Sequence, residues 1–283
     1  VRNPVNPRQV SRVSLSPEVV DGFVFWTKNP APMIPWLDKL PDCPYYFQVT
    51  LTPYDGQIER YLPSKRKVIL PAVRQLARQI GPERVVWRYD PVFLTERYSV
   101  DFHKKAFAQI ARLLRGNTVR CVISFLDWYP PMEKRLRPLA PRPLGGDEMR
   151  ELAASFGQAA AENGMRIFTC AETADLSGFG VEHGCCIDRD LLERIGGRPL
   201  CAEKDRSQRA ACGCVQSVDI GAYDTCPGGC LYCYADHGVG RTMRNLAGFD
   251  PSSPLLCSSL RPDDTVRERK MQSGWTEQTT LFG

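Results

Sequence analysis

Short runs of β-branched and aromatic residues alternate with longer amphipathic stretches through the first two-thirds of the chain. The short runs are bounded by proline, glycine or charged residues and predict five strands, at residues 22–27, 45–52, 84–90, 119–127 and 165–170. The amphipathic stretches predict helices at residues 65–80, 100–114 and 147–163. Alternating strands and helices imply parallel strands joined by right-handed crossovers. The pattern therefore predicts an α/β fold, either a doubly wound sheet or a full or partial β/α (TIM-like) barrel.

Two of the expected helices carry local signals at their ends. Pro71 lies inside the first amphipathic stretch, so we expect that helix to kink or to begin there. Asp147 is the expected N-cap of the third helix, and Asn163-Gly164 is expected to end it.

The character of the chain changes after Gly197. From Arg198 to Gly283 the chain is rich in Gly, Pro, Ser and Cys and has no long periodic run. Its apolar residues are too few to offset the loss of chain entropy on their own. We therefore expect a β/α core over residues 1–197 and a Cys-rich irregular C-terminal tail over residues 198–283. Bound metal would order this tail against the barrel mouth.

Polar side chains stand where the expected strands end. The candidates are Lys28, Asn29, Thr50, Arg88, Asp90, Asp127 and Glu172. The C-terminal ends of the strands build the active site in β/α barrels, so this set predicts a site at the mouth. The alternative for single members, such as Arg88 with Asp90 or Lys28 with Asp90, is a structural ion pair at the rim.

Composition and charge narrow the protein class. The 283 residues are 43% hydrophobic and 24% charged, which is typical of a folded globular protein. No window approaches 18 apolar residues and no apolar signal segment is visible, so we expect a cytoplasmic protein without a membrane partner. The net charge of +5 comes from interspersed basic and acidic residues. It permits an anionic substrate but does not call for nucleic acid.

The number and clustering of the cysteines say most about the possible chemistry of the protein. The chain has 12 cysteines against 3 histidines, and the segment from Cys185 to Cys233 holds most of the cysteines. A chain of this length can bury a core without a disulfide framework. The clustering therefore indicates metal in a reducing compartment, with disulfides as the alternative.

The sharpest motif is Cys226-Pro-Gly-Gly-Cys230-Leu-Tyr-Cys233. Close cysteine spacing in a glycine-rich loop lets several thiolates hold one iron–sulfur cluster. Three protein ligands would leave one iron of a cubane with an open coordination position, which is typical of catalytic metals.

A second group comprises Cys170, Cys186, Cys212 and Cys214. Four thiolates with no open position suit a second, fully protein-ligated [4Fe–4S] cluster or a structural Zn²⁺. Cys185 competes with Cys186 for membership, and Cys201 competes with either half of the Cys212–Cys214 pair. Alternatively, Cys170 and Cys186 are small buried hydrophobic residues.

The C-x3-C-x-aromatic-C pattern resembles the cluster motif of the radical S-adenosylmethionine (SAM) superfamily. This resemblance implies a β/α barrel and an oxygen-sensitive [4Fe–4S] cluster on Cys226, Cys230 and Cys233, with SAM chelating the unique iron. Reduction would cleave SAM to a 5′-deoxyadenosyl radical that abstracts hydrogen. It also implies that Tyr232 lies near the adenine, and that a low-potential donor such as a ferredoxin or flavodoxin supplies the electron.

The whole chain further resembles the family called domain of unknown function 1848. The resemblance rests on VFWTKNP, VVWRYDP, HGCCID and CGCVQSVDIGAYDTC. Members begin with a further strand-like segment, so we expect a first strand ahead of Val1. The three cysteines follow all the expected strands, whereas radical SAM proteins place them after the first. The tail must therefore fold back over the mouth.

These observations favour a radical SAM-type enzyme that acts on an unknown small molecule. Lys28, Arg88, Asp90, Asp127 and Glu172 are the candidate polar contacts of SAM or substrate, and Asn29 and Thr50 are candidate cofactor contacts. One rival is an iron–sulfur electron-transfer or cluster-binding protein that does not use SAM. The other is a zinc-stabilised nucleic-acid-binding or DNA-repair protein, although the tail has no dense basic stripe interleaved with aromatics.

Overall fold

A computed structural model describes residues 1–276, and its centre is a six-stranded parallel sheet. The strands follow one another in chain order: β2 (Phe23–Thr27), β3 (Tyr45–Thr50), β4 (Val85–Val92), β5 (Arg120–Phe125), β6 (Arg166–Cys170) and β7 (Val181–Gly184). The expected parallel α/β architecture is confirmed. The full barrel is not, because β2 and β7 are the two edges of an open sheet and do not pair with each other.

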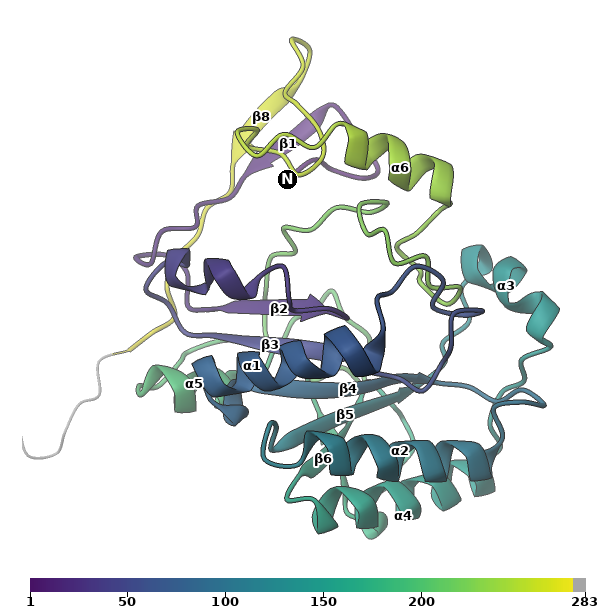
Figure 1. The fold of residues 1–283 in the computed structure, drawn as a ribbon. Coiled ribbons are helices and arrows are strands. Elements are labelled where there is room, and N and C mark those ends of the chain that lie inside the picture. Colours follow the sequence, from purple (N-terminus) through teal and green to yellow (C-terminus); the bar gives the residue numbers. More distant parts are fainter. Residues whose placement is uncertain (277–283) are drawn as a thin grey trace, which may run out of the picture.

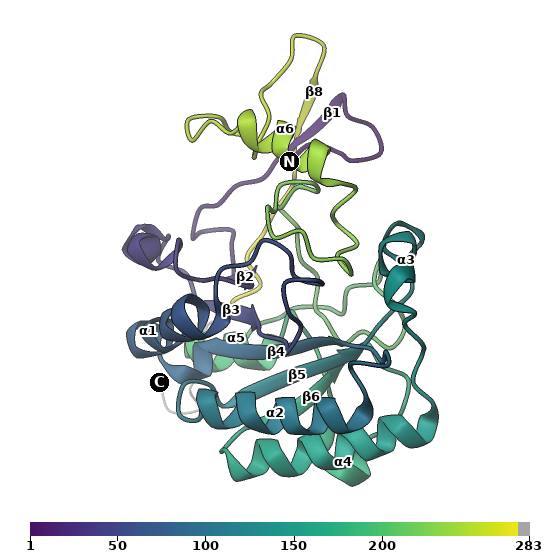
Figure 2. The same cartoon turned by 45° about the vertical axis from the view of Figure 1, so that its right-hand side comes forward.

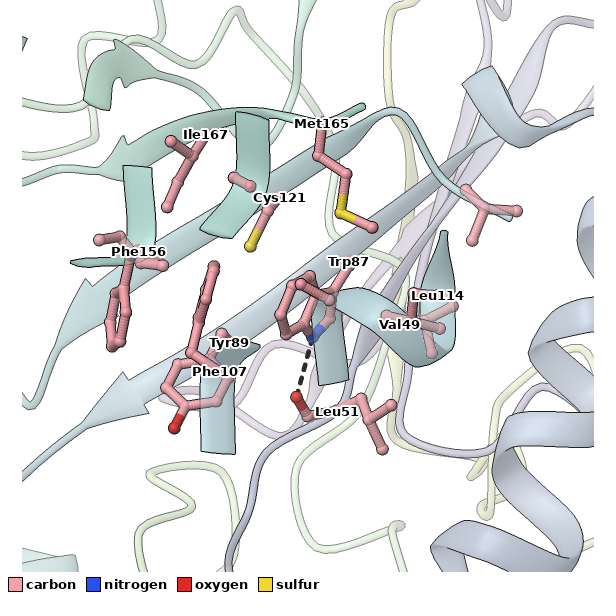
Figure 3. Close-up of a cluster of buried hydrophobic side chains, with 14 of the residues drawn as sticks. Val49, Leu51, Trp87, Tyr89, Phe107, Leu114, Cys121, Phe156, Met165 and Ile167 are labelled. Atoms are coloured by element: carbon pink, nitrogen blue, oxygen red, sulfur yellow. Dashed lines mark hydrogen bonds between the residues drawn. The ribbon is translucent and has the colours of Figure 1, made fainter. Parts of the chain in front are cut away.

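Three amphipathic helices cover one face of the sheet (Figure 1): α1 (Leu70–Ile80), α2 (Val100–Leu114) and α4 (Gly146–Glu162). The core on this face is continuous, and Phe107 of α2 stacks on Phe156 of α4 with ring centroids 4.1 Å apart. Trp87 of β4 packs in the same cluster, and its indole N–H donates to the Leu51 carbonyl at 2.9 Å (Figure 3). Burial of these large side chains fixes which face of each strand is covered.

The opposite face of the sheet is divided. Helix α5 (Arg189–Gly196) covers the half near the starts of the strands, where Leu191 and Leu192 pack against Tyr46, Val86 and Phe168. Farther along the same face the side chains become polar. By the period of two along a strand, this half carries Gln48, Arg88, Asp90, Ser124 and Cys170.

The expected strand and helix positions agree with the observed ones to within a few residues, with one error at a helix start. Helix α1 has Pro71 in its first turn, as expected, and a π-helical turn (Lys65–Ile69) precedes it. Asp147 is not the N-cap of α4, because that helix begins at Gly146. Instead, the Glu148 carboxylate accepts the Gly145 N–H at 2.9 Å, and Asp147 pairs with Arg150.

The remaining elements are short. They are β1 (Gln9–Arg12), α3 (Pro130–Leu136), α6 (Val239–Ala247), β8 (Thr265–Glu268) and the 3-10 turns Ile34–Lys39, Pro82–Arg84, Arg137–Leu139 and Ser177–Phe179. Strands β1 and β8 pair in parallel, so the first and last strands of the described chain form a two-stranded sheet. Figure 2 shows this pair and α6 standing apart from the main sheet.

Among residues 1–276, no helix combines the length and the apolar character that crossing a bilayer requires.

Candidate functional site

Cys226, Cys230 and Cys233 lie on one tight turn, here called the three-cysteine turn (residues 226–233). A Cβ atom placed on Gly228 would lie 3.4 Å from the Cys226 sulfur and 3.8 Å from the Cys230 sulfur. The two thiols therefore face the same side of a backbone position that carries no side chain. The Gly228 N–H donates to the Cys226 sulfur at 3.4 Å, a contact that favours negative charge on that sulfur.

Backbone hydrogen bonds hold this turn against the segment that follows β3. The Leu231 N–H donates to the Ile58 carbonyl at 3.0 Å, and the Tyr61 N–H donates to the Gly228 carbonyl at 3.1 Å. Glu59 and Cys230 form an antiparallel bridge between these two contacts. The tail thus reaches the carboxyl end of the sheet, where Lys28 follows β2.

Tyr232 joins the three-cysteine turn to a buried charged group. Lys28 Nζ lies 2.6 Å from the Tyr232 hydroxyl and 2.8 Å from Glu59 Oε1, and the Tyr232 hydroxyl donates to the same carboxylate. The Thr52 hydroxyl donates to Glu59 Oε1 at 2.7 Å, and Lys65 forms an ion pair with Oε2. A single carboxylate, 1% exposed, thus lies between two ammonium groups.

The electrostatics of this group favour anions. Burial opposes ionisation of Glu59, but the charges of Lys28 and Lys65 outweigh it and lower the pKa of the carboxyl. Burial also lowers the pKa of Lys65 and raises the pKa of the Cys230 thiol to about 12, an effect that the nearby Lys28 charge opposes. The Lys28 charge thus offsets part of the burial that disfavours a Cys230 thiolate, and two cations against one carboxylate would attract an anion that arrives beside the turn.

The ring of Tyr232 is enclosed. It packs against Tyr54 and Phe93 at centroid distances of 5.8 and 6.3 Å, and the residue is 8% exposed. The side chain therefore anchors the turn in a small apolar cluster, and its hydroxyl is the part that faces the charged group.

A cavity of about 370 Å³ lies beside Cys226 of the turn. Its lining includes Tyr61, Cys226, Gly229, Val239 and Met243. Volumes in this range accommodate small molecules.

The second cysteine group lies on the polar half of the sheet face that α5 partly covers. The sulfurs of Cys170 and Cys186 are 2.9 Å apart. The Cys214 sulfur accepts N–H groups from Cys186 at 3.2 Å and from Ile187 at 3.3 Å. Cys212 is buried two residues away on the same turn. A Cβ on Gly213 would meet Cys185 Cβ at 3.3 Å, so this turn packs directly on the segment after β7.

Arg88 links this group to the strand ends. One guanidinium nitrogen donates to the Cys186 sulfur and to Gln48 Oε1, both at 2.8 Å, and the guanidinium also binds Asp90 at 2.5 and 3.0 Å. Burial disfavours both charges, but each stabilises the other, so the pKa of Arg88 is raised and that of Asp90 is lowered. The Lys28 charge also lowers the pKa of Asp90.

The other expected site residues lie around this region. Asn29 Oδ1 accepts the Ala31 N–H at 3.2 Å, and Thr50 lies beside Arg88 in the register of β3 and β4. Glu172 accepts the Phe125 N–H at 2.8 Å, and burial raises its pKa. Asp127 is half exposed and pairs with Arg209 at 2.6 Å.

The structure thus gathers the expected residues into two groups. Lys28, Tyr232 and the three cysteines form one, while Arg88, Asp90, Cys170, Cys186 and Cys214 form the other. Sequence reasoning missed Glu59 and Lys65 as site residues. Glu59 lies in the irregular segment after β3 and Lys65 begins the π-helical turn before α1, so no strand-end pattern marked them. Gln48 shares a strand face with Thr50, so the alternation along this strand predicts that it belongs to the same polar stripe.

The donor chemistry of the three-cysteine turn fits an iron–sulfur cluster. The turn offers three thiols, a Cβ-free position between two of them and a neighbouring cation. Within residues 1–276, no three His, Cys, Asp or Glu side chains already have the arrangement of a metal site. Metal binding at either cysteine group would therefore require the side chains to rearrange.

Comparison with known proteins gives one match. No curated protein and no solved structure matches the chain. The sequence model of a family described as Domain of unknown function (DUF1848) matches residues 1–235, a range that includes the three-cysteine turn. Because this match covers more than half of the 283 residues, the chain belongs to the DUF1848 family.

Proposed function

We propose that the protein is an iron–sulfur enzyme of the radical SAM type that acts on a small molecule. Cys226, Cys230 and Cys233 would hold a [4Fe–4S] cluster. The bound cluster would supply an iron with a free coordination position, at which SAM is bound and cleaved after one-electron reduction. A cytoplasmic ferredoxin or flavodoxin is the proposed electron donor.

One observation carries the proposal: the three-cysteine turn is seated by backbone pairing at the carboxyl end of the parallel sheet, next to Lys28. Ligands of open α/β sheets bind at this edge. The sequential strand order matches that of a β/α barrel, so we regard the six strands as a partial barrel. A tail with a purely structural metal would have no need of this position.

The protein's own residues would bind and orient SAM. Lys28 is held by Glu59 and Tyr232 and is 19% exposed, so it can donate to a carboxylate that arrives beside the turn. The cavity beside Cys226 offers apolar contact for the rest of a ligand. Asp90, with the Ser124 hydroxyl donating to it, lies toward the second cysteine group and is a candidate contact for a substrate hydroxyl or amine.

The proposal is tested with anaerobically reconstituted protein. We expect SAM to change the paramagnetic resonance spectrum of the reduced cluster, and a strong reductant to yield methionine and 5′-deoxyadenosine. Cys226→Ala should abolish both effects. Cys201→Ala is the matched control, because both cysteines are exposed and Cys201 lies outside the turn.

Two outcomes would favour the rival functions. A reducible cluster whose spectrum is unchanged by SAM, with no cleavage product, would indicate electron transfer. Zinc in place of iron at the three-cysteine turn would indicate a structural or nucleic-acid-binding role.

A further inference from the structure

The sulfurs of Cys170 and Cys186, 2.9 Å apart, are closer than the usual non-bonded contact between two sulfur atoms. Cys214 is the third sulfur of the group, and it accepts the backbone N–H of Cys186 at 3.2 Å. The three residues come from the end of β6, from the segment after β7 and from the tail. Chain connectivity alone does not bring them together.

The donors around these sulfurs indicate what the group binds. Cys214 accepts two backbone N–H groups, and Cys186 accepts a guanidinium N–H from Arg88. Three N–H donors stabilise negative charge on sulfur, as around metal-bound thiolates. A neutral disulfide between Cys170 and Cys186 would be a weak acceptor for the Arg88 N–H that binds Cys186.

The backbone of this region is also fixed before any ligand arrives. The carbonyl of Cys186 accepts hydrogen bonds from the Tyr46 hydroxyl and, at 2.5 Å, from Gln48 Nε2. The Asp188 N–H donates to the Tyr46 hydroxyl at 3.0 Å. Gln48 and Tyr46 project from β3, so the sheet itself positions the cysteine segment.

We infer that Cys170, Cys186 and Cys214, with Cys212 as the fourth ligand, form a second metal centre of four thiolates. This centre would lie on the polar half of the sheet face that α5 partly covers. Cys212 is chosen because it is buried and lies two residues from Cys214 on the same turn. Arg88 acts as a positioning residue that holds the Cys186 sulfur. Four thiols would bind a thiophilic metal, either as a single zinc ion or as an iron–sulfur cluster, and they would release their protons to solvent.

This second centre does not depend on SAM or on the three-cysteine turn, and the test separates the two. The protein is the full chain with Cys226, Cys230 and Cys233 all replaced by alanine, purified without oxygen after growth with iron and zinc. We expect this triple variant to retain metal. Iron with equal sulfide identifies a cluster, and zinc or sulfide-free iron identifies a single ion.

Adding Cys186→Ser or Cys214→Ser to the triple variant should lower the metal content at least fivefold. Cys121→Ser is the control for a buried cysteine, because Cys121 lies on the opposite face of β5 in the apolar core. Cys201→Ser is the control for an exposed one. Neither control should reduce the metal content.

A measurement on the triple variant without the added serine substitutions guards against a serine variant that does not fold. Cobalt(II) added to the metal-free triple variant should give the intense charge-transfer absorption of thiolate-bound cobalt, in a one-to-one titration. Lack of that absorption together with lack of retained metal overturns the inference. A Cys170–Cys186 disulfide found by alkylation and mass spectrometry in the anaerobic protein overturns it as well.

Discussion

His103 is a buried base in the aromatic core between β4 and α2. Its ring lies 2.8 Å from the Tyr89 hydroxyl and 3.0 Å from the Phe93 carbonyl, and the residue is fully buried. Burial lowers its pKa to about 4, although the hydrogen bond to Phe93 opposes the shift. The folded protein therefore keeps this imidazole neutral at pH values where the unfolded chain protonates it.

The stability contributed by a neutral His103 is complete above pH 6.5 and is lost as the pH falls toward 4. Between pH 7.5 and 5 the loss should be about 2 kcal/mol. Chemical unfolding of wild type and His103→Gln at both pH values measures it, because glutamine keeps a donor and an acceptor but does not titrate. Equal pH dependence in the two proteins would contradict the prediction.

Glu59 is the second residue with a large expected effect. Glu59→Gln removes the carboxylate that pairs with both Lys28 and Lys65, so it should lower the free energy of unfolding by about 3 kcal/mol. The Lys104–Glu151 pair is the control, because Glu151 is 52% exposed. Glu151→Gln should cost less than about 1 kcal/mol. Similar losses for the two variants would mean that Glu59 is not a buried counter-ion.

At the scale of elements, the close packing of α4 depends on one glycine. A Cβ on Gly157 would lie 2.1 Å from the Phe179 carbonyl oxygen, in the turn before β7. Gly157→Ala should therefore push α4 away from this turn and cost about 2–3 kcal/mol. At Gly178 a Cβ meets nothing within 4 Å, so Gly178→Ala should change stability by less than about 0.5 kcal/mol. Denaturant titration of both variants gives the comparison.

The elements also show what the sequence could predict. The five strands and three long helices expected from the sequence could be predicted from periodicity, because each buries a regular set of apolar side chains. Strand β7 has four residues, only one of which is fully buried, and α5 has eight residues. Such short elements form through tertiary contacts and carry too little local pattern to be recognised.

Part of the candidate site could also be predicted from the sequence. Lys28, Arg88 and Asp90 could be found because Lys28 directly follows β2 and the other two lie in the second half of β4, both of which are strands with a regular pattern. Glu59 could not, because its role comes from contacts with Lys28 and with Tyr232, which lies 173 residues further along the chain. Long-range partners of irregular segments leave no local pattern in a single sequence.

At the scale of the whole molecule, the tail has two kinds of attachment. Strand β8 pairs with β1, and Trp275 donates to the Asp21 carbonyl at 3.0 Å, without any thiol. The segment from Lys204 to Arg244 contains both tail cysteine groups and little regular structure. Only this segment should depend on metal for its order.

Removal of metal should therefore speed tryptic cleavage at the exposed Arg206 and Arg241 and leave cleavage in β8, at Arg267, unchanged. Limited proteolysis of the metal-loaded and chelated protein, followed by mass spectrometry, locates the cuts. Equal rates at Arg206 and Arg241 in both forms would show that apolar packing, not metal, orders the segment.

The separation of Glu59 from Tyr232 along the chain has a consequence during synthesis. The seat for the three-cysteine turn leaves the ribosome long before the turn itself, because 173 residues separate the two partners. At ordinary rates of translation this delay is on the order of 10–30 s. For that interval the nascent sheet has its polar edge uncovered, with Lys28 and Glu59 facing solvent. Any metal that binds at the turn would therefore arrive only after all six strands of the main sheet have been synthesised.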